Sequence, residues 1–143
     1  MTVGKSFFDT NVLLYIYSAA DPHKQAVARQ VFKECRDGGR IVVSTQVVQE
    51  FHAVGARKLA IPKDALRLLT TGLLDLPIVH VKPVHILKAL QNEEDYQISF
   101  WDALILAAAE SAGATVLYTE DLNDGQQYGI VRVENPFRLL KDR

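Results

Sequence analysis

Four acidic residues in this 143-residue sequence lie beside or within apolar stretches, where charged groups are uncommon. Asp9 interrupts KSFFDTNVLLYIY, Asp121 follows ATVLYTE, and Glu50 and Asp102 lie in STQVVQEFHAV and SFWDALILAAAE. If such acids converge, two unit charges about 4 Å apart repel by about 4 kcal/mol at an effective dielectric constant of 20. A bound cation would relieve that repulsion. Carboxylates without cysteine favour a hard, oxygen-binding ion, Mg²⁺ or Mn²⁺.

The elements around these acids predict that they meet at one edge of a sheet. Apolar strands are expected at 6–8, 41–43, 78–81, 115–118 and 130–133, alternating with helices at 11–19, 22–38, 45–59, 62–74, 83–94 and 99–112. This alternation predicts a single α/β domain over 1–143, built on a mainly parallel sheet. Sites in such sheets form at the carboxyl ends of strands. Asp9 and the segment Thr119-Glu120-Asp121 each follow a predicted strand directly.

Each acid also has an ordinary structural explanation, which the sequence leaves open. The alternatives are Asp9 as a helix N-cap, Glu50 as a helix-edge acid paired with Arg57 or Lys58, Asp102 as the partner of Ser99 in a capping box, and Asp121 and Asp124 as turn residues in EDLNDG.

Composition narrows the class of protein. A net charge of −1 excludes a strongly basic nucleic-acid-binding protein but leaves room for a local basic patch. Cys35 is the only cysteine, which excludes an intramolecular disulfide and a thiolate metal cluster. The first residues, MTVGKSFFDT, lack the pattern of a signal peptide, and the longest strongly apolar stretch, near Ala103–Ala109, is far shorter than a bilayer span. We therefore expect a cytoplasmic protein.

Five segments, in this order, resemble one known family. They are FFDTNVLLY (7–15), STQVVQEF (44–51), FWDALILAAA (100–109), YTEDLNDGQ (118–126) and NPF (135–137). The sequence resembles the PIN-domain ribonucleases, and most closely the VapC-type toxins of bacterial toxin–antitoxin systems. The resemblance implies a three-layer α/β/α sandwich with about five strands, mainly parallel, in the order 3-2-1-4-5.

The resemblance also implies a function and a site. The activity would be hydrolysis of RNA phosphodiester bonds by an endoribonuclease that uses Mg²⁺ or Mn²⁺, with a small antitoxin protein and a homodimer as expected assemblies. The implied acidic metal site consists of Asp9, Glu50, Asp102 and Asp121, with Asp124 as an alternative or additional acid and Asn11 and Thr119 as polar supporting residues. Of these, Asp9 and Asp102 are the best candidates for direct ligands, and Glu50 could orient or deprotonate the attacking water. Glu120 is expected to point away.

RNA would also require cations near the acids. The candidates are Lys5, Arg57 and Lys58, with Arg40, Lys63 and Arg67 as further possibilities. Phe100 and Trp101 are expected in the core or at a subunit interface, not against a base.

Two other functions remain open at this point. A phospho-aspartyl phosphatase of the haloacid dehalogenase type would use Asp9 as a nucleophile, but the second acid of its D-x-D pattern is replaced by Asn11. A non-catalytic binding module on the PIN fold would not need all four acids.

Overall fold

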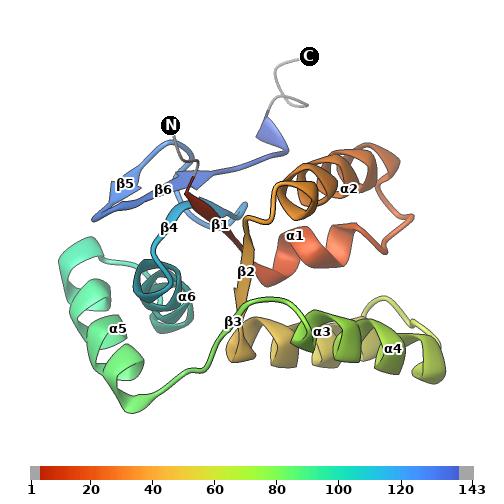
Figure 1. Cartoon of the computed structure of the whole chain (residues 1–143), viewed down its shortest axis with the longest axis horizontal. Helices are drawn as coiled ribbons and strands as arrows, with labels where there is room; N and C mark the ends of the chain where they lie inside the picture. The colour runs from red at the N-terminus through yellow and green to blue at the C-terminus, as the bar shows by residue number, and fades with distance from the viewer. Residues whose placement is uncertain (1–3, 139–143) are drawn as a thin grey trace.

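The computed structural model describes residues 4–138 and contains a six-stranded sheet, ordered β3-β2-β1-β4-β6-β5 (Figure 1). The strands are β1 (Lys5–Phe8), β2 (Ile41–Ser44), β3 (Ile78–Val79), β4 (Ala114–Tyr118), β5 (Gln127–Tyr128) and β6 (Val131–Glu134). Neighbouring strands are parallel except for the antiparallel pair β5–β6. The expected order is therefore confirmed for β3-β2-β1-β4-β6. The sequence did not predict β5, since two residues are too few to show an alternating pattern.

Six helices connect and cover these strands. They are α1 (Thr10–Tyr15), α2 (Pro22–Asp37), α3 (Thr45–Arg57), α4 (Lys63–Leu74), α5 (Pro83–Tyr96) and α6 (Phe100–Ser111). Side-chain oxygens of Asp21, Ser44 and Ser99 accept backbone N–H groups three residues ahead, which fixes the starts of α2, α3 and α6. Helix α1 is shorter than predicted, because the chain turns after Tyr15 to begin α2 at Asp21-Pro22.

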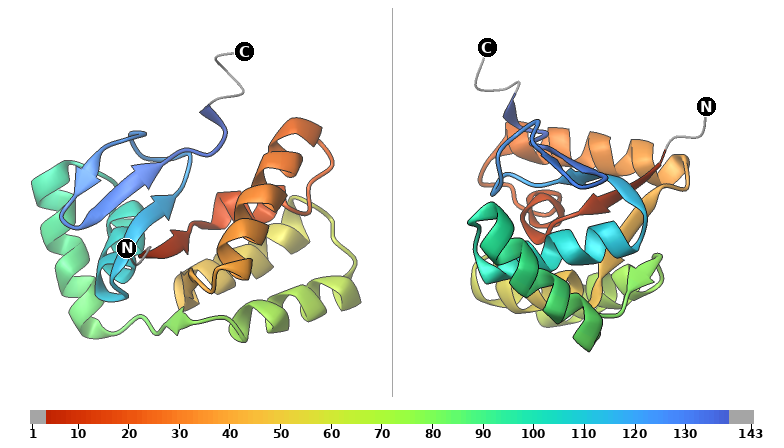
Figure 2. Two further views of the ribbon diagram at one scale, coloured as in Figure 1. Left: turned by 45° about the horizontal axis from the view of Figure 1, so that its top comes forward. Right: turned by 90° about the vertical axis from the view of Figure 1, so that its left-hand side faces the viewer.

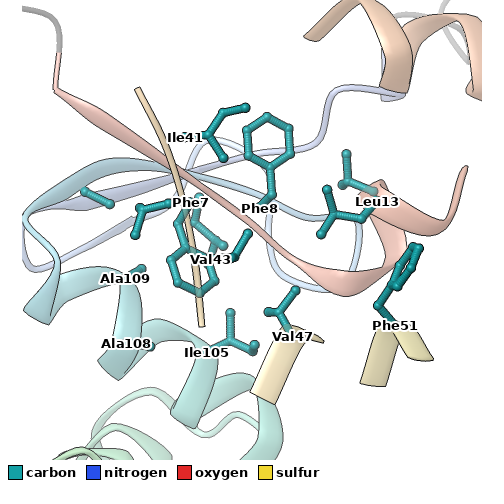
Figure 3. Packing of buried hydrophobic residues seen from close by; sticks show 14 of the residues in the cluster. Phe7, Phe8, Leu13, Ile41, Val43, Val47, Phe51, Ile105, Ala108 and Ala109 are labelled. Atoms are coloured by element: carbon teal, nitrogen blue, oxygen red, sulfur yellow. The ribbon is translucent and has the colours of Figure 1, made fainter. Parts of the chain in front are cut away.

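Two adjacent phenylalanines show how the layers pack. In β1, Phe7 and Phe8 are both completely buried and point to opposite faces of the sheet (Figure 3). Phe7 lies toward Ala108 and Ala109 of α6, whereas Phe8 makes an edge-to-face contact with Phe32 of α2, with ring centroids 5.6 Å apart. Figure 2 shows α2 on one side of the sheet and α5 and α6 on the other. This is the expected α/β/α sandwich.

Strands β1 and β4 are parallel neighbours, and the chain leaves both at the same edge. Phe8 pairs with Tyr118, and the backbone N–H of Asp9 donates to the Tyr118 carbonyl at 3.0 Å. The strands β2 and β3 lie on the other side of β1 from β4, so the strand order changes direction between β1 and β4. Such a switch point leaves room for a site between two diverging connections. Within residues 4–138, no helix has the length and apolar character needed to cross a bilayer.

Candidate active site

Asp9 lies at the switch point and is almost entirely buried, with 5% of its surface exposed. It is the N-cap of α1, and its Oδ1 accepts the backbone N–H of Thr10 at 2.7 Å. Its other oxygen, Oδ2, accepts the hydroxyl of Thr119 at 2.8 Å. The capping explanation is therefore correct, but it accounts for only one of the two carboxylate oxygens.

Thr119 connects the two sheet-edge acids. Its buried hydroxyl donates to Asp9 and also accepts the backbone N–H of Asp121 at 3.1 Å. Asp121 is held from a second side by Asn11, whose Nδ2 donates to Asp121 Oδ2 at 2.9 Å. One hydroxyl and one carboxamide thus set the relative positions of two carboxylates that are far apart in the sequence.

Helix α6 supplies the third carboxylate. Ser99 caps this helix by accepting the backbone N–H of Asp102 at 3.1 Å, as the capping explanation predicts. The Ser99 side chain also hydrogen-bonds with the Asp102 carboxylate, which only partly offsets the rise that burial causes in the pKa of Asp102. One carboxylate oxygen from each of Asp9, Asp102 and Asp121 lies within 4.8 Å of the other two. We call these three residues the acidic cluster.

Glu50 lies beside the acidic cluster and is fixed by two hydrogen bonds. The Thr10 hydroxyl donates to Glu50 Oε2 at 3.0 Å, and Gln46 Nε2 donates to Oε1 at 2.8 Å. Glu50 therefore does not need the Arg57 or Lys58 partner that its structural explanation assumed. The sequence analysis did not identify Thr10 or Gln46. A glutamine four residues before a glutamate on a helix is a usable signal, whereas the Thr10 contact depends on the packing of α1 against α3.

Burial and mutual repulsion raise the pKa of every member of the acidic cluster. The pKa of Asp9 rises from 3.8 to about 7, mainly because burial disfavours its charge, although hydrogen bonds from Thr119 and Thr10 oppose the rise. The pKa values of Asp102 and Asp121 are also raised, again mainly by burial. The negative charge of Glu50 contributes to all three shifts. The site therefore holds more negative charge than its own donors neutralise.

Two neighbouring acids have other partners. Asp124 accepts the backbone N–H of Asn135 at 2.7 Å and lies 3.5 Å from Arg138. Glu120 accepts hydrogen bonds from Lys24 Nζ and the Tyr15 hydroxyl, each at 2.9 Å. Of Asp121 and Asp124, the structure thus brings Asp121 to the acidic cluster and ties Asp124 to the C-terminal segment.

The predicted RNA-contacting cations separate into two groups. Arg57 lines a cavity together with Glu50, and Lys58 lines another with Asn11. Lys5, in contrast, begins β1 and pairs with Ala114, at the end of the strand opposite to Asp9. At about 3.3 Å per strand residue, this puts the two backbones about 13 Å apart. Lys5 is therefore not beside the acids, and its contact with RNA stays a prediction.

Hollows adjoin the acids on two sides. One, of about 330 Å³, is lined by Asp102 and Asp121 together with polar residues that include Asn123 and Gln126. The other, of about 660 Å³, lies between α3 and α6 and includes Glu50 and Trp101 in its wall. An extended substrate could therefore lie across the acids and occupy both hollows.

Comparison with known proteins assigns the family. The sequence matches the PIN domain over residues 6–125, which is most of the chain. The chain belongs to the PIN-domain family. Its fold is similar to a chain of a toxin–antitoxin complex from Klebsiella pneumoniae, with a TM-score of 0.70 and 20% identity, covering 92% of this chain and 98% of that one. No curated protein matches this PIN domain.

Two further solved structures show the same fold. The DNA-bound VapBC of Salmonella typhimurium gives a TM-score of 0.68 at 19% identity, with 94% of this chain and 99% of that chain covered. VapC20 of Mycobacterium tuberculosis, a toxin that cleaves the sarcin–ricin loop, gives a TM-score of 0.66 at 18% identity, with 82% of this chain and 90% of that chain covered. At these identities the similarity establishes the fold alone. The resemblance found in the sequence is thus confirmed for family and fold.

The acidic cluster has the composition expected of a site for a hard divalent cation. Its donors are carboxylate oxygens, which Mg²⁺ and Mn²⁺ prefer, and no histidine or cysteine belongs to it. The raised pKa values mean that these carboxylates lack sufficient positive charge nearby. A cation between them would restore their ionised forms and remove their repulsion.

Proposed function

We propose that this PIN domain is a divalent-metal-dependent endoribonuclease that acts as the toxin of a toxin–antitoxin pair. The observation that carries the proposal is the acidic cluster, with three carboxylates within 4.8 Å at the switch point of a PIN sheet and Glu50 beside them. The RNA-cleaving activity of VapC20, which has the same fold, supports RNA as the substrate. Mg²⁺ is the proposed ion, with Mn²⁺ as a substitute.

Each acid has a separate role in this proposal. Asp9 and Asp102 would bind the ion directly, and Asp121, which follows the neighbouring strand β4, would complete the oxygen donor set. When bound, the ion supplies Lewis acidity to the phosphodiester and its attacking water. Glu50 accepts the proton of that water, since Thr10 and Gln46 hold its two oxygens in a fixed orientation. Thr119 and Asn11 keep Asp9 and Asp121 in place, as outer hydrogen-bond donors do for metal ligands.

The test compares cleavage of RNA by the purified protein and by variants that remove one carboxylate. Asp9→Asn and Asp102→Asn should each abolish cleavage in Mg²⁺ or Mn²⁺ while the circular dichroism spectrum stays that of the wild type. Full cleavage by either variant would contradict the proposed site.

A matched pair of variants separates the two acids of the last segment. Asp121→Asn should lose activity, because its carboxylate belongs to the acidic cluster. Asp124→Asn should retain most activity, because its carboxylate contacts Asn135 and Arg138 instead. The reverse result would assign the fourth acid position to Asp124.

The cellular context forms part of the same proposal. A small antitoxin partner is proposed because two of the compared structures are toxin–antitoxin assemblies. A homodimer and a cytoplasmic location are proposed from the resemblance in the sequence. Induced expression should halt growth, and coexpression of a protein encoded beside this gene should restore it. RNA sequencing after induction of the wild type and Asp9→Asn would then map the cleaved sites.

The alternative functions differ from this one in measurable ways. A non-catalytic PIN module would not bind Mn²⁺ at millimolar concentration, whereas the acidic cluster should. A phospho-aspartyl phosphatase would form a covalent phosphate at Asp9, but Asn11 donates to Asp121 and offers no second carboxylate. The nuclease remains the function that the arrangement of side chains supports best.

A further inference from the structure

The only tryptophan of the chain lies in an unexpected place. Trp101 is 63% exposed, although large aromatic side chains are usually mostly buried. Of the two positions expected from the sequence, the core or a subunit interface, this exposure excludes the core. Trp101 lies in the first turn of α6, directly before Asp102 of the acidic cluster.

Trp101 forms one wall of the 660 Å³ cavity between α3 and α6. The opposite wall is one face of α3, formed by residues three or four positions apart: Gln46, Gln49, Glu50, Ala53 and Arg57. Ala53, with its small side chain, leaves space opposite the indole ring. The cavity is thus continuous with the proposed catalytic residue Glu50.

Contacts within the protein hold this wall in position. The Phe100 ring meets the Trp101 ring edge-to-face, with centroids 5.3 Å apart and planes at 77°. Gln46 Nε2 donates both to Glu50 and to the Trp101 carbonyl, at 2.8 and 3.4 Å. The backbone that carries the indole ring is therefore tied to the same side chain that orients Glu50.

The cavity offers an aromatic ring beside polar and charged side chains, a combination that suits a nucleobase. Apart from Trp101 and Ala53, every lining side chain is polar or charged. A nucleobase has an aromatic face to stack on the indole ring and a polar edge to meet the exposed carboxamide of Gln49. Arg57 supplies a cation for a neighbouring phosphate.

We propose that the cavity between α3 and α6 is a base-binding subsite, in which a nucleotide next to the cleaved phosphodiester stacks on Trp101. This inference rests on the proposed function and specifies how the protein binds one base of its RNA substrate. Stacking on an aromatic side chain tolerates different bases, so Trp101 supplies affinity. The exposed carboxamide of Gln49 selects among the bases through hydrogen bonds.

The first test uses the indole itself as the probe. Because the full chain contains one tryptophan, its fluorescence reports on position 101 alone. A short single-stranded oligoribonucleotide, added in EDTA to prevent cleavage, should quench this fluorescence. A ribose-phosphate oligomer of the same length without bases should not. Equal quenching by both oligomers, or by neither, would overturn the inference.

The second test measures affinity by the anisotropy of a labelled oligoribonucleotide. Trp101→Ala should weaken binding about 5- to 100-fold, the range expected for loss of one stacked base. Trp101→Phe should restore most of the affinity, whereas Trp101→Leu should not, because only the former keeps an aromatic face. Leu87→Ala, on the 66% exposed Leu87 of α5, is the matched control and should bind as the wild type does.

Further outcomes separate this inference from the proposed function. If the acids prove dispensable for cleavage but bases still quench Trp101, the proposed function fails and the base-binding subsite stands. If cleavage requires the acids but Trp101→Ala binds and cleaves RNA normally, the subsite is excluded. If Trp101→Ala leaves RNA affinity unchanged but alters the molecular mass in solution or releases a coexpressed partner, Trp101 belongs to a protein interface instead.

Discussion

The substitution Asp9→Asn should stabilise the metal-free protein at the same time as it removes activity. Burial raises the pKa of Asp9 from 3.8 to about 7, so the folded state keeps its proton over a pH range in which the unfolded state has released it. Asparagine keeps the shape without the charge. Its oxygen can accept the Thr10 N–H, and its NH₂ group can donate to the Thr119 hydroxyl.

The sign and size of this difference in stability follow from proton linkage. Below pH 3.8 the carboxyl is protonated in both states and contributes nothing. Between pH 3.8 and 7 the folded state binds more protons than the unfolded state, so the free energy of unfolding falls as the pH rises. Above pH 7 the carboxylate is charged in both states, and the full penalty for burying its charge lowers the free energy of unfolding. At about 1.4 kcal/mol per pH unit, the penalty for burying the Asp9 charge amounts to about 4 kcal/mol. We expect the unfolding free energies of the wild type and Asp9→Asn to differ by about 2–4 kcal/mol above pH 7.

The assay is urea denaturation of the wild type and Asp9→Asn in EDTA at pH values from 4 to 8.5. The difference between the two unfolding free energies should grow in favour of the variant as the pH rises. Saturating Mn²⁺ should reverse the order by stabilising only the wild type. Because the pKa values of Asp102 and Asp121 are also raised, the free energy of unfolding of the variant should still fall as the pH rises, but less steeply than that of the wild type. A variant less stable than the wild type at pH 8 without metal would refute the reasoning.

The remaining predictions concern single contacts. Thr119→Val should lower the free energy of unfolding by about 1–3 kcal/mol in urea titrations, because it removes a buried hydrogen bond to a carboxylate. Glu50→Gln should keep the fold but slow single-turnover cleavage by about 10²–10⁴-fold if Glu50 is the general base. Lys24→Met should cost no more than about 1 kcal/mol in thermal unfolding, because its ion pair with Glu120 is partly exposed. Mn²⁺ at 100 times its Kd should stabilise the wild type by about 2.7 kcal/mol, whereas Asp102→Asn should gain little at that concentration.

The positions of the acids at one sheet edge could be predicted because they follow from local patterns and one topological rule. Apolar runs identified β1 and β4, and parallel strands end at the same edge, so Asp9 and Asp121 were expected at that edge. That β1 and β4 are neighbours was implied only by the resemblance to the PIN family. The helical spacing of the apolar residues around Asp102 predicted that it shares the face of α6 that packs toward the core. These inferences needed no knowledge of packing between distant helices.

The sequence predicted least where distance along the chain differs from distance in space. Lys5 is close to Asp9 in sequence, but an extended strand carries it to the opposite end of the sheet. Trp101 directly precedes the buried residues of α6, yet its own side chain in the first turn is exposed. The contact of Thr10 with Glu50 depends on how α1 meets α3, and that of Gln46 with the Trp101 carbonyl depends on how α3 meets α6. No local pattern encodes that arrangement.

The order in which the acidic cluster is assembled has a consequence during synthesis. Asp9 is translated near the start of the chain, whereas Asp121 and the Thr119 hydroxyl that positions it come about 110 residues later. At about 5–20 residues per second, roughly 5–20 s separate the first ligand from the last. Until then the nascent chain lacks a complete set of carboxylates. A ribosome making this protein therefore carries no finished acidic cluster until Asp121 has been translated.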